Sequence, residues 1–125
     1  RIVEGFVAAE ILKHQVNRGR RKELYFFRDQ QGLEVDFLFP GESGGLWMVE
    51  CKASKTVQPA MAGPLQSLRR TMGKHEPVRA AIIHPKAASP APMRTVAPQV
   101  EALDVQEFLD ALADKTARPK KRRQE

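Results

Sequence analysis

The sequence predicts an α/β domain in which a mixed β-sheet, an antiparallel meander plus added strands, is flanked by helices. Three observations predict it. Apolar residues recur at helical spacing near both ends of the chain, three consecutive runs in the first half have strand character, and a helix-length segment separates them from the next apolar run. Because a strand that follows a helical crossover can pair in parallel, the sheet is expected to be mixed.

The first predicted element is a helix over residues 2–16, whose apolar positions 3, 7 and 11, with 6, 9, 12 and 16, follow helical spacing. Asn17 and Gly19 can end it. Residues 23–28, "ELYFFR", and 33–39, "LEVDFLF", are separated by the turn "DQQG", which predicts a hairpin. We expect its aromatic residues 25–27 to lie in the core.

A third strand is predicted over residues 46–54, "LWMVECKAS", after the Gly-rich break "PGESGG". Side chains alternate across a strand, so Trp47, Val49 and Cys51 should share one face, and Met48, Glu50 and Lys52 the other. Trp47 is expected in the core.

The second half of the chain predicts a helix over residues 60–72, with Pro64 in its first turns, and a short strand over 79–84. Residues 85–99 contain four of the nine prolines and are expected to form a surface loop. A weak strand over 100–105 and a short amphipathic helix over 105–113 complete the order. No internal repeat is visible.

Length and composition limit the class of protein. A chain of 125 residues fits one domain, which we place at residues 1–113. No apolar run approaches the roughly 20 residues that span a bilayer, so no membrane contact is expected. The first residue is Arg1 and the chain starts within a predicted element, so we expect a fragment of a longer protein. The single cysteine, Cys51, indicates a reducing, cytoplasmic setting.

The formal charge of +6 is concentrated in the tail, residues 114–125. That segment holds six Lys or Arg and one Glu from residue 115 onward, a net +5, which leaves the rest of the chain near neutral at +1. Such a tail is expected to be disordered, either as a plain solvated segment or as a salt-sensitive contact for nucleic-acid phosphates.

Chemistry is indicated by Asp36, Glu50 and Lys52. Asp36 is flanked by two apolar residues and should point away from the face of Val35, while Glu50 and Lys52 share a face. If the two runs are neighbouring strands, the three groups can converge. Carboxylates suit Mg²⁺ or Mn²⁺, and a nearby Lys can orient a water and offset phosphate charge, so the set suits phosphodiester hydrolysis.

These residues resemble the PD-(D/E)xK restriction-endonuclease-like superfamily. Asp36 matches the Asp of the second strand, Glu50 and Lys52 match the E-x-K strand, and Glu4 matches the helix carboxylate that many members add, with Glu10 as the alternative. Val35 stands where the pattern has Pro. The resemblance implies that Glu4, Asp36 and Glu50 bind Mg²⁺ or Mn²⁺ and that Asp36, Glu50 and Lys52 are catalytic.

More narrowly, "VEGFVAAEILKH", "ELYFFRDQQGLEVDFLF" and "VECKASKT" resemble the C-terminal domain, of unknown function, found in bacterial and archaeal AAA-type ATPases, over roughly residues 1–112. This implies an ATPase module elsewhere in the parent chain and DNA as a partner, through the active-site face and the basic tail. No G-x-x-x-x-G-K-[ST] loop exists here, so we expect no ATP site of that kind within the fragment.

Several alternatives remain open at this stage. The domain is either a metal-dependent DNA nuclease or a catalytically inactive accessory domain that contacts protein, and the nearly neutral body favours the second. Lys55 and Thr56 could contact phosphate or simply lead into the next helix, and the basic cluster at residues 18–22 allows the same two interpretations. His14, His75 and His84 show no paired spacing and are expected at the surface or at strand ends.

Overall fold

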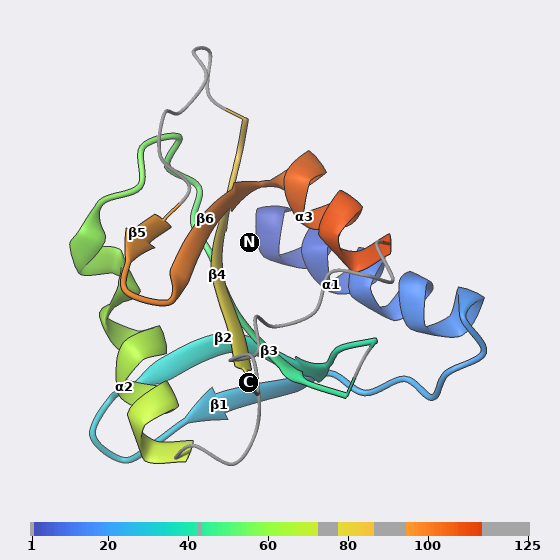
Figure 1. Ribbon diagram of the computed structural model, residues 1–125, viewed down its shortest axis with the longest axis horizontal. Helices are drawn as coiled ribbons and strands as arrows, with labels where there is room; N and C mark the ends of the chain where they lie inside the picture. Colours follow the sequence, from blue (N-terminus) through green and yellow to red (C-terminus); the bar gives the residue numbers. More distant parts are fainter. Residues whose placement is uncertain (1, 43, 73–77, 87–94, 114–125) are drawn as a thin grey trace, which may run out of the picture.

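The computed structural model describes residues 2–42, 44–72, 78–86 and 95–113 (Figure 1). The predicted order of elements is confirmed, with one further strand. In chain order the elements are α1 (Ile2–Asn17), β1 (Tyr25–Arg28), β2 (Glu34–Pro40), β3 (Leu46–Cys51), the 3-10 turn η1 (Pro59–Ala62), α2 (Gly63–Met72), β4 (Val78–His84), β5 (Thr95–Ala97), β6 (Val100–Asp104) and α3 (Val105–Ala113).

All strands form one mixed sheet in the order β1-β2-β3-β4-β6-β5. The first three strands pair antiparallel as the predicted meander. β4 then adds in parallel to β3, after the crossover through η1 and α2, and β6 adds in parallel to β4. Strand β5 pairs antiparallel with β6 and closes the far edge. The predicted α/β class with a mixed, helix-flanked sheet is therefore confirmed.

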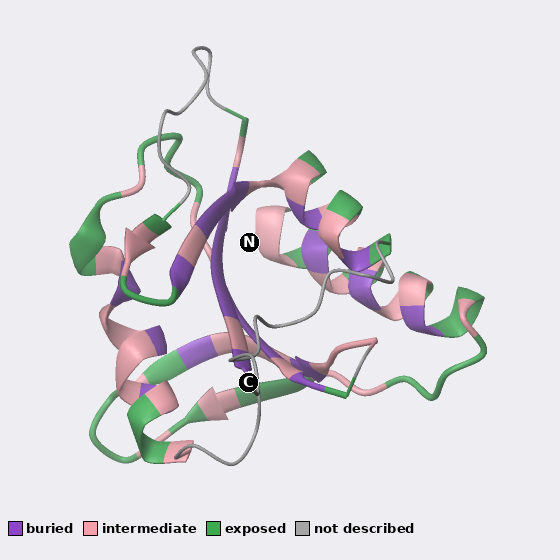
Figure 2. Ribbon diagram, viewed as in Figure 1, coloured by how far each residue is buried: buried purple, intermediate pink, exposed green. Residues whose placement is uncertain are grey.

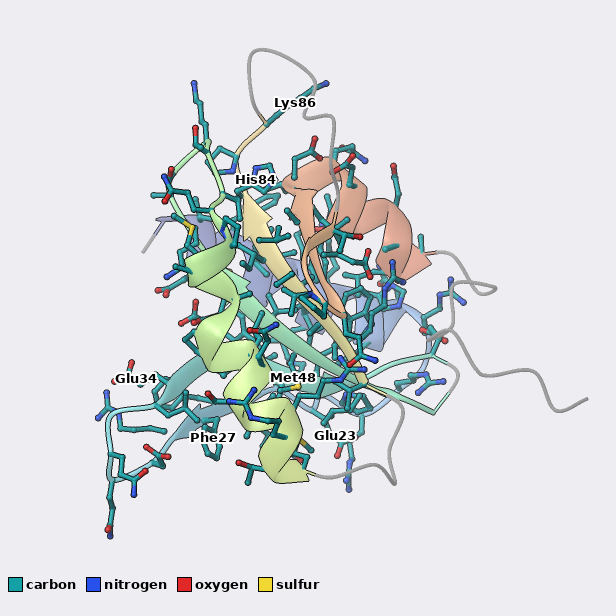
Figure 3. The ribbon with its side chains drawn as sticks, turned by 60° about the vertical axis from the view of Figure 1, so that its left-hand side comes forward. Glu23, Phe27, Glu34, Met48, His84 and Lys86 are labelled. Atoms are coloured by element: carbon teal, nitrogen blue, oxygen red, sulfur yellow. The ribbon has the colours of Figure 1, made fainter. Side chains whose placement is uncertain are left out.

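The two faces of the sheet bury different helices. We call them the α1/α3 face and the α2 face (Figure 1). The α1/α3 face holds Val7 and Ile11 of α1 and Phe108 of α3 against the strands, and Trp47 and Phe39 stack there with ring centroids 5.8 Å apart. The α2 face is covered by η1 and α2, and Figure 3 shows Phe27 and Met48 on this side of the sheet. The buried apolar residues that the strands, η1 and α2 place there include Val35, Met48, Ala62, Leu65, Leu68, Ala80 and Ile82.

The central strands are the most buried part of the chain (Figure 2). In β3 the side chains of Trp47 and Val49 pack on the α1/α3 face, with Cys51 beside them, and Met48 packs on the α2 face, as the alternation predicts. Burial of such apolar side chains contributes about 25 cal/mol per Å² and dominates the stability of the domain. Trp47 is buried in the core, as expected from the sequence.

Strand β2 carries one extra residue relative to β1. Tyr25 pairs with Leu38 and Phe27 with Val35, so two steps along β1 face three steps along β2. This is a β-bulge, which bends a strand and re-aims a side chain. Val35 and Leu38 consequently pack on the α2 face although they are three residues apart. Asp36 lies within the bulge.

Two expectations from the sequence need correction. Tyr25 and Phe26 are not core residues: they are 54% and 57% exposed, because β1 is an edge strand paired with β2 alone. Residues 85–99 are not wholly a loop, since they contain β5, which forms the edge beside β6. The expectation that His84 lies at the surface or at a strand end is confirmed, since it is the last residue of β4, where it is buried.

Two expectations remain, on membrane-spanning segments and on the C-terminal tail. In the part of the chain that the structure describes, no helix has the length and apolar character needed to cross a membrane. The predicted tail at residues 114–125 and His75 lie outside the described residues.

Candidate functional site

The candidate site lies at the carboxyl ends of the parallel strands. β3, β4 and β6 run in the same direction, so they end at one edge of the sheet, at Cys51, His84 and Asp104. β2 runs the opposite way, which brings its amino end, with Asp36, to this edge. In open α/β sheets, ligands bind beyond the carboxyl ends of the strands.

Asp36 and Glu50 exchange hydrogen bonds with each other's strands. The backbone N–H of Asp36 donates to Oε1 of Glu50 over 3.2 Å, and the backbone N–H of Cys51 donates to Oδ2 of Asp36 over 2.8 Å. Regular pairing of β2 with β3 ends at Phe37 and Val49, one step before these residues. The two carboxylates therefore accept backbone hydrogen bonds just beyond the last regular pair of these strands.

Strand register explains how these two carboxylates meet. Phe37 pairs with Val49, and both pack on the α1/α3 face. Alternation from this pair therefore puts Asp36 opposite Glu50, on the side of Met48. The carboxylate of Asp36 lies against the backbone of β3, where it accepts from the N–H of Cys51.

Glu4 of α1 completes a chain of three carboxyl groups. Asp36 lies close enough to both Glu4 and Glu50 for each to shift its pKa, so it occupies the middle of the chain. Glu10, the alternative helix carboxylate, pairs with Lys13 over 3.1 Å on the same helix. The structure thus brings Glu4, and not Glu10, to Asp36.

Burial and mutual repulsion raise the pKa values of this chain. Burial is the main cause at Glu50, which is 6% exposed, and the negative charge of Asp36 adds to it, so the pKa of Glu50 rises to about 8. The pKa of Asp36 is also raised, chiefly by burial, while the Cys51 N–H favours its charged form. With a pKa of about 8, Glu50 is mostly protonated at neutral pH.

Lys52 supplies the positive charge nearest to this chain. Its ammonium group lowers the pKa of Glu50 and so opposes the effect of burial. The backbone N–H of Lys52 donates to the carbonyl of Ile83 over 2.9 Å, which extends the pairing of β3 with β4 past Cys51. Among the described residues the ammonium group forms no ion pair, so it is available to a water or a phosphate oxygen.

The carboxyl chain fits a divalent cation only in part. Among the described residues, no group of three or more His, Cys, Asp and Glu side chains is arranged to hold a metal ion. Asp36 and Glu50 lie close enough to repel each other, and a cation between like charges relieves such repulsion. Mg²⁺ commonly takes one or two protein carboxylates and completes its shell with waters and substrate phosphates. The donor set therefore fits Mg²⁺ or Mn²⁺ as a two-carboxylate site with Glu4 beside it.

The other candidates from the sequence lie apart from this chain. Three arginines of the basic cluster make structural contacts: Arg18 with the carbonyl of Ala113, Arg20 with Glu42, and Arg21 with Glu23. His14 pairs with Glu42 over 2.8 Å. Lys55 and Thr56 are exposed in the segment after β3.

Sequence reasoning missed two parts of this edge. One is the backbone N–H of Cys51, which no side-chain pattern identifies. The other is His84, whose position at the end of a strand parallel to β3 would have pointed to it once the pairing was known. His84 is 6% exposed, and its Nδ1 donates to the carbonyl oxygen of Pro85 over 2.8 Å.

The fold and the site together define this protein as an α/β domain with a cluster of carboxyl groups at the carboxyl ends of its parallel strands. The chain belongs to a family of domains of unknown function, DUF4143, whose family model it matches over residues 1–99. Neither the search of curated proteins nor that of solved structures finds a match. The matched range includes Glu4, Asp36, Glu50 and Lys52.

Proposed function

We propose that this domain is a metal-dependent phosphodiesterase of the PD-(D/E)xK type that acts on DNA. The observation that carries the proposal is the Glu4–Asp36–Glu50 chain, with Glu50 buried and Glu4 and Asp36 half-buried, next to Lys52, whose ammonium group has no ion-pair partner within the described ranges. Asp36 lies on the second strand and Glu50 near the end of the third, the positions that the resemblance implies.

Each residue has a role in this proposal. Asp36 and Glu50 would hold Mg²⁺ or Mn²⁺, with Glu4 beside them, and Glu50 must release its proton to do so. When bound, the ion supplies charge neutralisation at the phosphate and a more acidic water. Lys52 would orient the attacking water and stabilise the negative charge that develops on the phosphate.

Cleavage of plasmid and linear DNA with Mg²⁺ or Mn²⁺ tests the proposal. We expect Lys52→Ala to reduce the rate at least about 100-fold, the usual contribution of a positioned group that moves or orients protons. Lys13→Ala is the matched control, since Lys13 is exposed and pairs with Glu10 on the same helix. Equal cleavage by the Lys52→Ala variant and the unmodified chain would sink the assignment.

A second candidate is a catalytically inactive accessory domain that contacts protein. Two observations favour it: the carboxylates of Asp36 and Glu50 already accept backbone hydrogen bonds, and the body of the chain is nearly neutral. A DNA-binding face usually carries excess positive charge. Isothermal titration with Mn²⁺ separates the two functions. Binding heat with the unmodified chain that disappears in Asp36→Asn favours the enzyme, and no binding heat with the unmodified chain favours the accessory domain.

We further propose that the domain works beside an AAA-type ATPase module of the same parent chain. The support is the resemblance of residues 1–112 to domains with that arrangement. Copurification of an ATPase segment encoded with this domain, and a change in its ATP hydrolysis on addition of DNA, would test the link.

A further inference from the structure

A pocket of about 90 Å³ opens beside the candidate site on the α2 face. Its polar lining comes from Lys55, His84 and Thr95, and its apolar lining includes Val57, Val96 and Ala102. A cavity needs about 10–15 Å³ to hold one water molecule, so this pocket has room for roughly six or more groups of that size. That is more than a lone ion requires.

Strand pairing places the pocket next to Lys52. Glu50, Ile82 and Ala102 form one row across β3, β4 and β6, and His84 and Asp104 form the next row. Lys52 extends β3 alongside β4, as its backbone bond to Ile83 shows. Parallel strands lie about 4.8 Å apart, so a group held at His84 is one strand away from Lys52. Figure 3 shows His84 near the end of β4, beside the start of α3.

His84 brings a specific hydrogen-bonding group to this pocket. A carbonyl oxygen only accepts, so the bond to Pro85 fixes the proton on Nδ1 and leaves Nε2 as the acceptor of the neutral ring. Among the described residues Nε2 has no hydrogen-bond partner, and no fully buried side-chain nitrogen or oxygen there is left unsatisfied. Nε2 is therefore open to the pocket that its ring lines.

We propose that this pocket receives one unstacked base of a DNA single strand, next to the phosphate held at the candidate site. The apolar walls suit the faces of a base, Nε2 of His84 accepts from a base N–H, and Lys55 contacts the adjoining phosphate. The inference rests on the proposed function for the position of the scissile phosphate. It implies that the substrate is single-stranded or frayed at the point of cleavage, because a paired base cannot leave its stack without cost.

Fluorescence anisotropy tests the pocket without cleavage. The labelled probes are a single-stranded oligodeoxynucleotide, its duplex, and the same strand with abasic sites, all in EDTA. We expect the single strand to bind best, and Ala102→Leu, which fills the pocket, to weaken its binding roughly tenfold. Ala9→Leu on the exposed surface of α1 is the size control, and Lys13→Ala, an exposed lysine of the same helix, is the charge control for Lys55→Ala.

The outcomes separate this inference from the proposed function. Equal affinity for the intact and abasic strands, or for the single strand and the duplex, would overturn the inference that the pocket receives a base, even if DNA is cleaved. Binding with the expected pattern but no cleavage with Mg²⁺ supports the pocket and counts against the enzyme. If Ala102→Leu fails to fold, NMR of the His84 ring decides: thymidine 5′-monophosphate should shift it and inorganic phosphate should not, and equal shifts overturn the proposal.

Discussion

The two ends of the parallel strands carry charged side chains in opposite arrangements. At the amino end, Arg79 of β4 binds both carboxylate oxygens of Glu101 on β6, at 2.9 and 3.2 Å, and its guanidinium group lies 4.6 Å above the ring of Trp47. At the carboxyl end, two acidic side chains, Asp36 and Glu50, lie together, and the pKa of each is raised.

This difference separates structural charge from functional charge. A bidentate pair stacked on an aromatic ring satisfies both partners and leaves nothing for a ligand. Crowded carboxyl groups with raised pKa values cost stability in the absence of a cation, which is typical of sites that bind or react. The sheet therefore gains stability at one end and gives up some at the other.

The largest expected effect on stability is that of Glu50→Gln as a function of pH. The pKa of Glu50 is about 8 in the folded chain and near 4.5 when unfolded, so the folded state binds more protons between these values and its stability falls as pH rises. We expect the variant to gain on the order of 4 kcal/mol relative to the unmodified chain from pH 4.5 to pH 9, because each pKa unit is worth about 1.4 kcal/mol.

Urea unfolding at the two pH values measures this gain. Glu34→Gln, an exposed carboxylate on β2, is the matched control and should change little. The same pH dependence in both variants would show that the carboxyl end is not strained.

At the amino end, Arg79→Ala should lower the free energy of unfolding by about 2 kcal/mol, through lost charge-assisted hydrogen bonds and the lost contact with Trp47. Arg28→Ala removes the same kinds of contact, to Glu34 and to the ring of Phe26, but at an exposed site, and should cost less than about 1 kcal/mol. Thermal unfolding compares them. Similar losses in both would contradict the importance of burial at Arg79.

Asp36→Asn should raise stability by about 1 kcal/mol at pH 8 while it weakens Mn²⁺ binding. The amide oxygen can still accept from the Cys51 N–H, and one like charge is removed. Chemical unfolding and titration with Mn²⁺ give the two readouts. A variant that is less stable than the unmodified chain would mean that the carboxylate serves mainly as a cap for β3.

The smallest expected effect sharpens the role of Lys52. Because its charge lowers the pKa of Glu50, Lys52→Ala should raise that pKa further. Carboxyl ¹³C NMR titration follows the change at Glu50 directly. An unchanged pKa would place the ammonium group too far from Glu50 to act on the same phosphate.

Periodicity predicted the fold well because both faces of the central strands are buried by helices. The alternation of Trp47, Val49 and Cys51 against Met48 reports those two faces directly. Strand β5 was missed because it is a short edge strand in a proline-rich segment, where the alternation of apolar and polar residues is weak. The aromatic residues Tyr25 and Phe26 misled because strand propensity does not report which surfaces are covered.

The sequence predicted that Asp36 and Glu50 converge if their runs are neighbouring strands, and β2 does pair with β3. Glu4, Asp36, Glu50 and Lys52 stand out as residue types at particular spacings, and α1 brings the first of them to the second. The bulge at Asp36 was not predicted, because it depends on pairing with β1, which a single strand's pattern does not contain. The pocket beside His84 likewise depends on four segments that meet only in the folded chain.

The hydrogen bonds of Asp36 and Glu50 have a consequence for how this sheet differs between its ligand-free and cation-bound states. The two carboxylates accept from the backbone N–H groups of Cys51 and Asp36, just beyond the last regular pair of β2 and β3. A cation bound to the same oxygens would compete with those N–H groups. Cation binding would therefore loosen the end of the β2–β3 pairing, and amide hydrogen exchange at Cys51 would report whether the site is occupied.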